Sequence, residues 1–261
     1  MFALWVPASI HGVIIVGLIA SLLFCSLAFI LGWLTLDGAA AAVIVGTTAF
    51  GFGGWPTVAV VICFFISGTL ISMEELSSNY GDKFGTSDGV RRDGLQVWAN
   101  GFWLVLWLVA GILTNLFVCW MAAVAVMAAA TADTWATELG SRRFSATTYL
   151  STTFEQVPPG TEGGISWPGL AASMAGSFFI AMVAAFGFSL SLGWIICITL
   201  AGFSASLADS YIGAKFQGTS TTLTLPGVSL QKQISIDNNM VNCLSTGFGS
   251  LMLLILNMVF L

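Results

Sequence analysis

Residues 115–132 read Asn-Leu-Phe-Val-Cys-Trp-Met-Ala-Ala-Val-Ala-Val-Met-Ala-Ala-Ala-Thr-Ala, and the next residue is Asp133. No charged residue occurs within this stretch, and almost all of its side chains are apolar. Because a helix that spans a lipid bilayer needs about 17–25 such residues, the stretch predicts a transmembrane helix. The acid that ends it predicts a polar site near the membrane surface.

Similar apolar runs recur along the whole chain. Hydrophobic residues make up 57% of the sequence and charged residues only 7%, whereas soluble domains contain about 25% charged residues. A water-soluble surface cannot be built from so few charges. The predicted fold class is therefore an all-α polytopic membrane protein, with residues 1–261 as a single integral membrane domain. We expect about eight transmembrane helices, at residues 6–31, 39–54, 55–72, 97–113, 115–132, 166–185, 192–212 and 239–260.

The joint between the second and third runs decides whether seven or eight helices cross the membrane. The two runs meet at Gly53-Gly54-Trp55-Pro56, which leaves very little chain for a turn. We expect eight helices, and seven stays the alternative. The first run is too long, and too uncharged at its start, for a cleaved signal peptide. We therefore expect it to be a membrane helix.

All seven lysines and arginines lie in three polar loops, at about residues 73–96, 133–165 and 213–237. An eight-helix topology places these loops on one side of the membrane and both termini on the other. Because positively charged loops stay cytosolic, we expect the three loops to face the cytosol. The organelle stays open, with the endoplasmic reticulum and the plastid envelope as candidates. The basic residues are Lys83, Arg91, Arg92, Arg142, Arg143, Lys215 and Lys232.

The net charge and the histidine count exclude whole classes of function. The net charge of −5 argues against binding to nucleic acid, which requires a basic surface. The chain has one histidine, His11, so a zinc site built on several histidines is excluded, as is a Ser-His-Asp triad away from the first helix. The five cysteines stand singly in apolar segments, and we interpret them as small buried side chains.

Four acids lie at the expected cytosolic ends of helices. Asp133 ends the fifth helix, Asp209 lies near the end of the seventh and Asp237 opens the eighth, while Glu138 follows Asp133 in the second loop. Carboxylates at such positions are costly and mark functional sites by default. Mg²⁺ takes oxygen ligands, usually one or two carboxylates together with substrate phosphates. The acids therefore predict a site for Mg²⁺ or Mn²⁺.

Two observations limit this interpretation. The acids can also be plain interfacial residues, and Asp237 suits the N-terminus of a helix, where a carboxylate accepts hydrogen bonds from free backbone N–H groups. Asp133 and Glu138 are five residues apart, which is about 140° around an ideal α-helix. Both can face one ion only if the helix changes between them.

The second loop contains a candidate phosphate-binding segment. Residues 147–154 are rich in β-forming and hydroxyl side chains, and residues 157–165 read Val-Pro-Pro-Gly-Thr-Glu-Gly-Gly-Ile. Glycines let backbone N–H groups converge on an anion, and the N-terminus of the following helix adds further free donors. A turn followed by a capped helix would give the same pattern.

Several of these segments resemble one known family. Residues 132–140 (Ala-Asp-Thr-Trp-Ala-Thr-Glu-Leu-Gly), 152–166 and 237–242 (Asp-Asn-Asn-Met-Val-Asn) are similar to the integral membrane family of domain of unknown function 92, as is Gln96-Val-Trp-Ala-Asn-Gly101. That family includes the plant phytyl-phosphate kinases and the animal transmembrane protein 19. Residues 208–215 more loosely resemble a signature of CTP-dependent polyprenol and phytol kinases.

The resemblance implies transfer of a phosphoryl group from a nucleotide, CTP or another, to an isoprenyl monophosphate such as phytyl, geranylgeranyl or farnesyl monophosphate. It implies that Asp133, Glu138, Asp209 and Asp237 are catalytic and hold Mg²⁺ or Mn²⁺. The residues expected to bind the phosphates of nucleotide and substrate are Arg92, Asn100, Arg142, Arg143, Thr152, Thr153, Gly160, Thr161, Glu162, Gly163, Gly164, Lys215, Asn238, Asn239 and Asn242.

Two other functions stay open at this point. A transporter or scramblase for an anionic lipid would use the same acids as a coupling site, although such sites lie near the bilayer midplane. A non-catalytic scaffold is the third candidate, and the acids at the helix ends argue against it. The expected partners are the bilayer and a lipid substrate, and the oligomeric state is open. The lipid tail is expected between helices, where small residues such as those at 122–130 leave room or, equally well, pack helices together.

Overall fold

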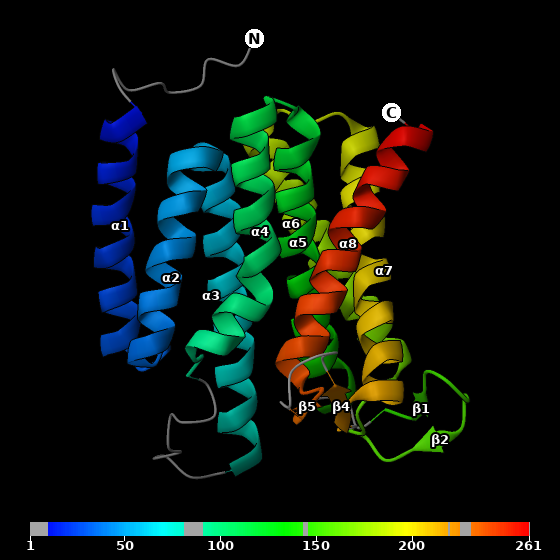
Figure 1. The fold of residues 1–261 in the computed structure, drawn as a ribbon. Coiled ribbons are helices and arrows are strands. Elements are labelled where there is room, and N and C mark those ends of the chain that lie inside the picture. Colours follow the sequence, from blue (N-terminus) through cyan, green and yellow to red (C-terminus); the bar gives the residue numbers. More distant parts are fainter. Residues whose placement is uncertain (1–9, 81–90, 143–145, 219, 225–230, 261) are drawn as a thin grey trace.

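The computed structural model describes residues 10–80, 91–142, 146–218, 220–224 and 231–260 (Figure 1). Its helices are α1 (Ile10–Ile30), α2 (Leu36–Thr48), η1 (Ala49–Gly53), α3 (Gly54–Tyr80), α4 (Gly94–Thr114), α5 (Phe117–Trp135), η3 (Ala136–Arg142), α6 (Trp167–Phe188), α7 (Leu192–Phe216) and α8 (Asn238–Phe260). The strands are β1 (Thr148–Leu150), β2 (Gln156–Val157), β3 (Gly164–Ile165), β4 (Ser220–Thr224) and β5 (Gln231–Ser235). The predicted all-α membrane fold is confirmed, since the strands are confined to loops.

The helix count depends on the second apolar run. Within the described ranges, seven helical runs are long and apolar enough to cross a membrane, and Leu36–Met73, with 38 residues, contains both α2 and α3. The chain reverses inside this run, at the π-helix η1 and at Gly54, whose φ of 68° is left-handed and suits glycine (Figure 1). The short joint predicted at residues 53–56 is therefore a turn between two antiparallel helices.

Helix α5 lies at the centre of the bundle, where α3, α4, α6, α7 and α8 contact it. Every residue from Met121 to Ala132 is buried. Small side chains let the neighbouring helices approach closely: a Cβ added to Gly202 of α7 would lie 2.8 Å from the Ala128 carbonyl carbon. The alanine-rich stretch 122–130 therefore packs helices together, which is one of the two roles that the sequence allowed.

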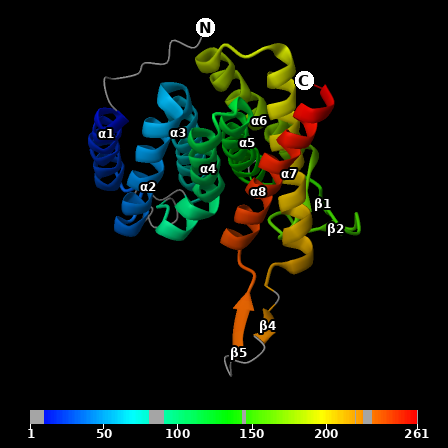
Figure 2. The same cartoon turned by 45° about the horizontal axis from the view of Figure 1, so that its top comes forward.

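The polar segments of the described chain gather at one end of the bundle, which we call the loop face. Helix α1 begins and helix α8 ends at the opposite face (Figure 1). At the loop face, residues around Leu34 and Arg92 form a parallel β-bridge, and β1 pairs with both β2 and β3. The β4–β5 hairpin projects away from the helices (Figure 2). This arrangement brings loops that are far apart in sequence to one surface.

Sequence-specific caps fix where two helices begin at the loop face. Asp93 starts α4 with a capping box, in which its side chain accepts from the Gln96 backbone N–H while the Gln96 side chain accepts from the Asp93 N–H. Ser166 starts α6 by accepting a hydrogen bond of 3.2 Å from the Gly169 N–H. These caps satisfy N–H groups that a helix terminus leaves free. The five cysteines are all free. Cys25, Cys119 and Cys197 are buried, as interpreted from the sequence, whereas Cys63 and Cys243 are only partly buried.

This topology predicts a labelling pattern. In a variant without the native cysteines, single cysteines at Met73, Thr153 and Gln217 should react with a membrane-impermeant reagent from the same side. A cysteine at Ser189, in the turn between α6 and α7, should react only from the other side. Labelling of residue 73 from the side of residue 189 would contradict the reversal between α2 and α3.

Candidate functional site

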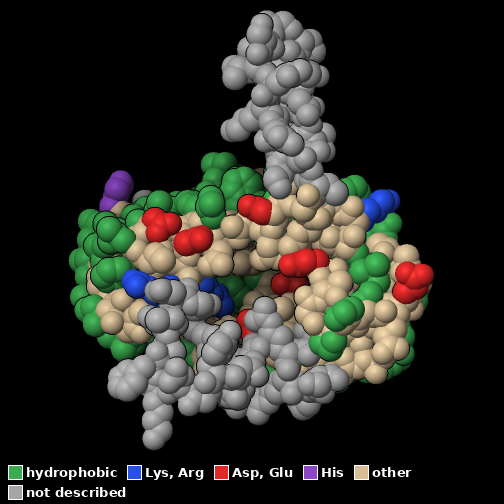
Figure 3. Space-filling view, turned by 90° about the horizontal axis from the view of Figure 1, so that it is seen from below, with side chains coloured by type: hydrophobic (Ala, Val, Ile, Leu, Met, Phe, Trp, Pro, Cys, Tyr) green, Lys and Arg blue, Asp and Glu red, His purple; other side chains and the backbone are tan. Residues whose placement is uncertain are grey.

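A polar cavity of about 480 Å³ opens at the loop face. Its walls come from α3, α4, α5, η3, α6, α7 and α8 and from the segment that precedes β3. Acidic and basic side chains surround a hollow when this face is viewed directly (Figure 3). Many of the predicted site residues line the cavity: Arg92, Asn100, Asp133, Glu138, Gly160, Thr161, Glu162, Gly163, Gly164, Asp209, Asn238 and Asn242.

Asp133 and Asp209 form a carboxyl pair in this cavity. They come from the packed helices α5 and α7, and their carboxyl groups lie close enough to interact. Asp209 is buried, and the Ser245 hydroxyl of α8 donates a hydrogen bond of 2.8 Å to its Oδ2. Two neighbouring carboxylates repel each other, and a cation between them removes that repulsion. The pair is therefore suited to bind a cation.

Glu138 reaches the same cavity because the helix changes its geometry after Asp133. Helix α5 ends at Trp135 and continues as the π-helix η3. A π-helix repeats over about five residues, so residues five apart diverge less than in an α-helix. The Glu138 Oε1 accepts a hydrogen bond of 3.1 Å from the Ser72 hydroxyl of α3. From the sequence, Asp133 and Glu138 can face one ion only if the helix changes between them. The change from α5 to η3 is such a change.

Arg92 is a buried cation of the cavity wall, to which Arg91 also contributes. Its guanidinium carbon lies 4.9 Å from the ring centroid of Phe64 and 5.5 Å from that of Phe65. Gly68 leaves room for it, because a Cβ there would collide with the guanidinium. Burial lowers the pKa of Arg92 to about 10, and the nearby Glu138 carboxylate opposes that shift. Arg92 is therefore charged at neutral pH, and its planar guanidinium is suited to bind a phosphate through two hydrogen bonds.

The glycine-rich segment forms the wall beside α7. Gly160 and Gly163 have φ values of 84° and 72°, in the left-handed region that favours glycine. A Cβ on Gly163 would also collide with Ala214, so the segment lies directly on the helix. The Thr161 and Gly164 N–H groups are bonded within the turn, to the Pro158 and Thr161 carbonyls. An anion at this wall would thus find fewer free backbone donors than the sequence pattern predicted.

Two buried polar atoms on the wall, Ser173 Oγ and Asn242 Oδ1, have no hydrogen-bond partner within the described residues. Buried polar groups are normally paired, so such atoms indicate positions that bind water, an ion or a ligand. Together with the carboxyl pair they are hard oxygen donors, which fits Mg²⁺. The described ranges contain no cluster of three or more His, Cys, Asp or Glu suited to a metal.

Several predicted site residues lie away from the cavity. Asp237 is exposed, and its Oδ1 accepts a hydrogen bond of 2.9 Å from the Met240 N–H, which is the capping contact that the sequence left open. Lys215 is exposed, with its ammonium group 5.7 Å from the ring of Tyr211 and 5.5 Å from that of Phe216. Thr152, Thr153 and Asn239 do not line the cavity either. The Arg142 side chain and all of Arg143 lie outside the described residues.

Sequence reasoning missed several polar residues of the wall. Gln96 precedes Asn100 by four residues and Ser206 precedes Asp209 by three, so each shares a helix face with a predicted residue. This helical spacing could have predicted that Gln96 and Ser206 line the same cavity. Ser72 and Ser173 stand alone in apolar surroundings, and only the packing of α3 and α6 brings them to the cavity.

The chain has relatives among known proteins. The model of the integral membrane protein family DUF92 matches residues 19–250. An uncharacterized membrane protein of Methanocaldococcus jannaschii is 32% identical over 183 residues, which are 69% of this chain and 74% of that protein. An uncharacterized membrane protein of Synechocystis is 28% identical over 221 residues, 83% of this chain and 80% of that protein.

A plant relative matches a shorter region. The chloroplastic protein VTE6 of Arabidopsis thaliana is 35% identical over 130 residues, 48% of this chain and 34% of the plant protein. No solved structure matches the chain.

A bundle of apolar helices with a polar cavity at one end defines a multi-pass integral membrane protein whose site opens at the membrane surface. Because the family match covers most of the sequence, the chain belongs to the integral membrane family DUF92. The family inferred from residues 132–140, 152–166 and 237–242 is thereby confirmed.

Proposed function

We propose that the protein is a Mg²⁺-dependent prenyl-phosphate kinase, which transfers a phosphoryl group from CTP or another nucleoside triphosphate to an isoprenyl monophosphate. The observation that carries the proposal is the neighbouring carboxyl pair, Asp133 and Asp209, in the same polar cavity as Arg92. The resemblance to the plant phytyl-phosphate kinases and the match to VTE6 support the same reaction class.

The chemistry asks little of the protein beyond positioning and neutralisation of charge. A phosphate oxygen of the isoprenyl monophosphate attacks the terminal phosphorus of the nucleotide, and the bond from that phosphorus to the bridging oxygen breaks. The products are the isoprenyl diphosphate and the nucleoside diphosphate. The attacking oxygen is already ionised, so no histidine base is needed, and His11 does not line the cavity.

Each part of the wall has a role in this reaction. Asp133 and Asp209 would hold the cation, which when bound neutralises charge on the nucleotide phosphates. Arg92 would bind and orient the acceptor phosphate. Asn238 and Asn242 open α8 at the cavity and offer amide donors to phosphate oxygens. Glu138 lies near Arg92 and would hold the guanidinium in place.

The position of the cavity favours a kinase over a transporter or scramblase. Transporter sites lie near the bilayer midplane, commonly on broken helices. Here the carboxyl pair lies in the last turns of α5 and α7, and loop residues such as Thr161 form part of the wall. We also propose that the loop face is cytosolic, on the positive-inside rule, which gives the site access to nucleotides.

The direct test is an assay of the purified full-length chain in lipid nanodiscs. Labelled CTP, ATP, GTP and UTP are each offered with geranyl, farnesyl, geranylgeranyl and phytyl monophosphates. We expect isoprenyl diphosphate to form with at least one pair. If a folded preparation transfers no label with any pair, the proposed function is wrong.

Nucleotide binding is expected to require a divalent cation. Without the cation, the nucleotide phosphates would face Asp133 and Asp209 with only Arg91 and Arg92 as basic side chains in the described wall. Calorimetry should show CTP binding in Mg²⁺ or Mn²⁺ and its loss in chelator, with recovery when Mg²⁺ is restored. Full affinity in chelator would remove the metal from the proposal.

A further inference from the structure

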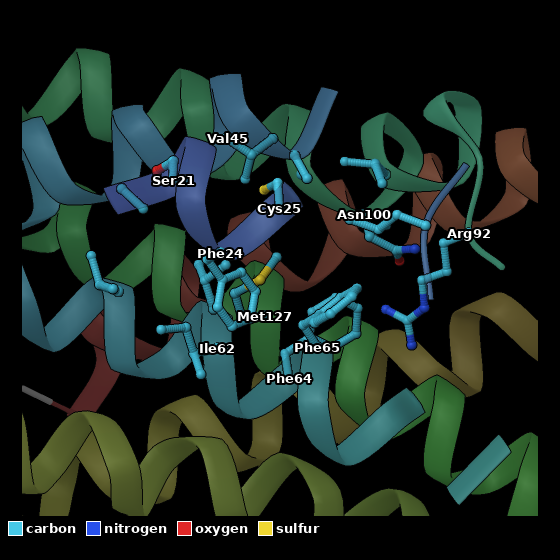
Figure 4. A pocket seen from close by; sticks show the side chains of 18 of the residues that line it. Ser21, Phe24, Cys25, Val45, Ile62, Phe64, Phe65, Arg92, Asn100 and Met127 are labelled. Atoms are coloured by element: carbon cyan, nitrogen blue, oxygen red, sulfur yellow. The ribbon is translucent and has the colours of Figure 1, made fainter. Parts of the chain in front are cut away.

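A second cavity, of about 170 Å³, lies between α1, α2, α3 and α4. Its wall is made mainly of apolar side chains, among them Phe24, Val45, Ile62 and Met127 (Figure 4). Apolar cavities of this kind hold hydrocarbon in preference to water. We call it the apolar cavity.

The apolar cavity adjoins the polar cavity of the candidate site. Arg92, Gln96 and Asn100 line both. These residues come from the segment before α4 and from its first turns, and the Asn100 amide donates a hydrogen bond of 3.1 Å to the Gln96 carbonyl. A ligand that fills both cavities must therefore pass these polar side chains.

Arg92 marks the border between the two environments. Its guanidinium lies over the rings of Phe64 and Phe65, and both rings line the apolar cavity. In Figure 4 the Arg92 side chain lies at one end of the cavity, and Phe24, Ile62 and Met127 lie farther along it. A phosphate bound to Arg92 thus has its ester substituent next to aromatic and aliphatic side chains.

The occupant that fits both cavities is an amphiphile with a compact anionic head and an apolar tail. A nucleotide would place polar groups against the apolar wall, and burial of unpaired polar groups is unfavourable. A free phosphate would leave the apolar cavity unused. Helix α1 contributes to this wall although its main packing contacts are with α2 and η1, so the cavity lies at the edge of the bundle, where a membrane lipid can enter.

We propose that the apolar cavity binds the isoprenoid tail of the acceptor, with the acceptor phosphate at Arg92, and that this cavity sets the preferred chain length. This inference rests on the proposed kinase function for the identity of the ligand. It adds the position of the tail, between α1, α2, α3 and α4, which neither the sequence nor the comparisons indicated.

A matched pair of substitutions on α2 tests the proposal. Ala42 lines the apolar cavity, whereas Ala40, two residues earlier, is exposed on the outside of the bundle and does not line it. The ratio of kcat/KM for phytyl monophosphate to that for dimethylallyl monophosphate should fall about tenfold or more in Ala42→Phe, because the added ring occupies space that a long tail needs. The ratio should not change in Ala40→Phe. Val58→Phe, from α3, gives a second obstruction in case Ala42→Phe does not fold.

A crosslinking measurement separates failure of this proposal from failure of the kinase function. A farnesyl monophosphate with a diazirine at the end of its tail is photolysed with the wild-type chain in nanodiscs, and labelled peptides are identified by mass spectrometry. Label in α1, α2 or α3 near the cavity supports the tail site, even if no transfer is observed. Label confined to other segments overturns the tail site, whatever the kinetic ratio does. Transfer with an unchanged ratio in both Ala42→Phe and Val58→Phe also overturns it, while the kinase function stands.

Discussion

Replacement of Asp209 by asparagine is expected to lower turnover about 10²–10³-fold with little change in folding. The amide has nearly the shape of the carboxylate and can still accept the hydrogen bond from Ser245. It removes the negative charge, however, so the pair with Asp133 can no longer neutralise a bound cation. Lys215, the basic residue nearest to Asp209 in the sequence, has its described contacts with Tyr211 and Phe216.

Turnover and melting temperature should be measured on the same preparation. Glu155→Gln is the matched control, because Glu155 is exposed in the β1–β2 turn and does not line the cavity. The double variant Asp133→Asn/Asp209→Asn should be little slower than either single variant, because groups that act as a unit are not additive. Wild-type turnover in Asp209→Asn would remove Asp209 from the catalytic residues.

Replacement of Arg92 by methionine is expected to lower kcat/KM for the isoprenyl monophosphate about 10–100-fold, chiefly through KM. Hydrogen bonds to charged groups contribute about 1.5–3 kcal/mol each, and methionine keeps the apolar contacts to Phe64 and Phe65 without the donors. If Arg92 only supports the start of α4, the melting temperature should fall and KM should stay the same. The two outcomes are therefore distinguishable.

Arg92→Lys adds a test based on pH. Burial lowers the pKa of Arg92 to about 10, so the wild-type guanidinium stays charged between pH 7 and about 9. A lysine begins from a pKa of about 10.4, and the same burial favours its neutral form at lower pH. Affinity for the acceptor should thus fall as the pH rises through this range in Arg92→Lys and hold steady in the wild type. Parallel pH profiles would contradict a phosphate contact at Arg92.

The predicted site residues that line the polar cavity have sequence signals that can be recognised without tertiary information. Asp133 and Asp209 stand out because an acid next to a long apolar run has few structural uses, and Gly160–Gly164 stands out by composition. Asp237 carries the same signal but has a local role, because its Oδ1 caps the helix through the Met240 N–H. An acid that begins a helix is satisfied by its own backbone, whereas an acid near the end of a helix needs a partner from elsewhere.

Residues that line the apolar cavity were not predictable in this way. Phe24, Val45 and Ile62 stand in apolar stretches of α1, α2 and α3, where lipid and protein neighbours favour the same side chains. The pattern of such a helix does not tell which face meets protein. The same reason explains why residues 122–130 allowed two interpretations until α5 was seen at the centre of the bundle.

The sequence by itself determined the class of protein, the approximate positions of the helices and the family, because each depends on composition or local order along the chain. Only the tertiary structure decided which acids meet, since the Asp133–Asp209 pair depends on how α5 packs against α7. It also decided that Glu138 joins them through the π-helix η3 and that Arg92 lies between a polar and an apolar cavity. These contacts join residues that are distant in sequence, and their geometry arises from helix packing, which local sequence does not encode.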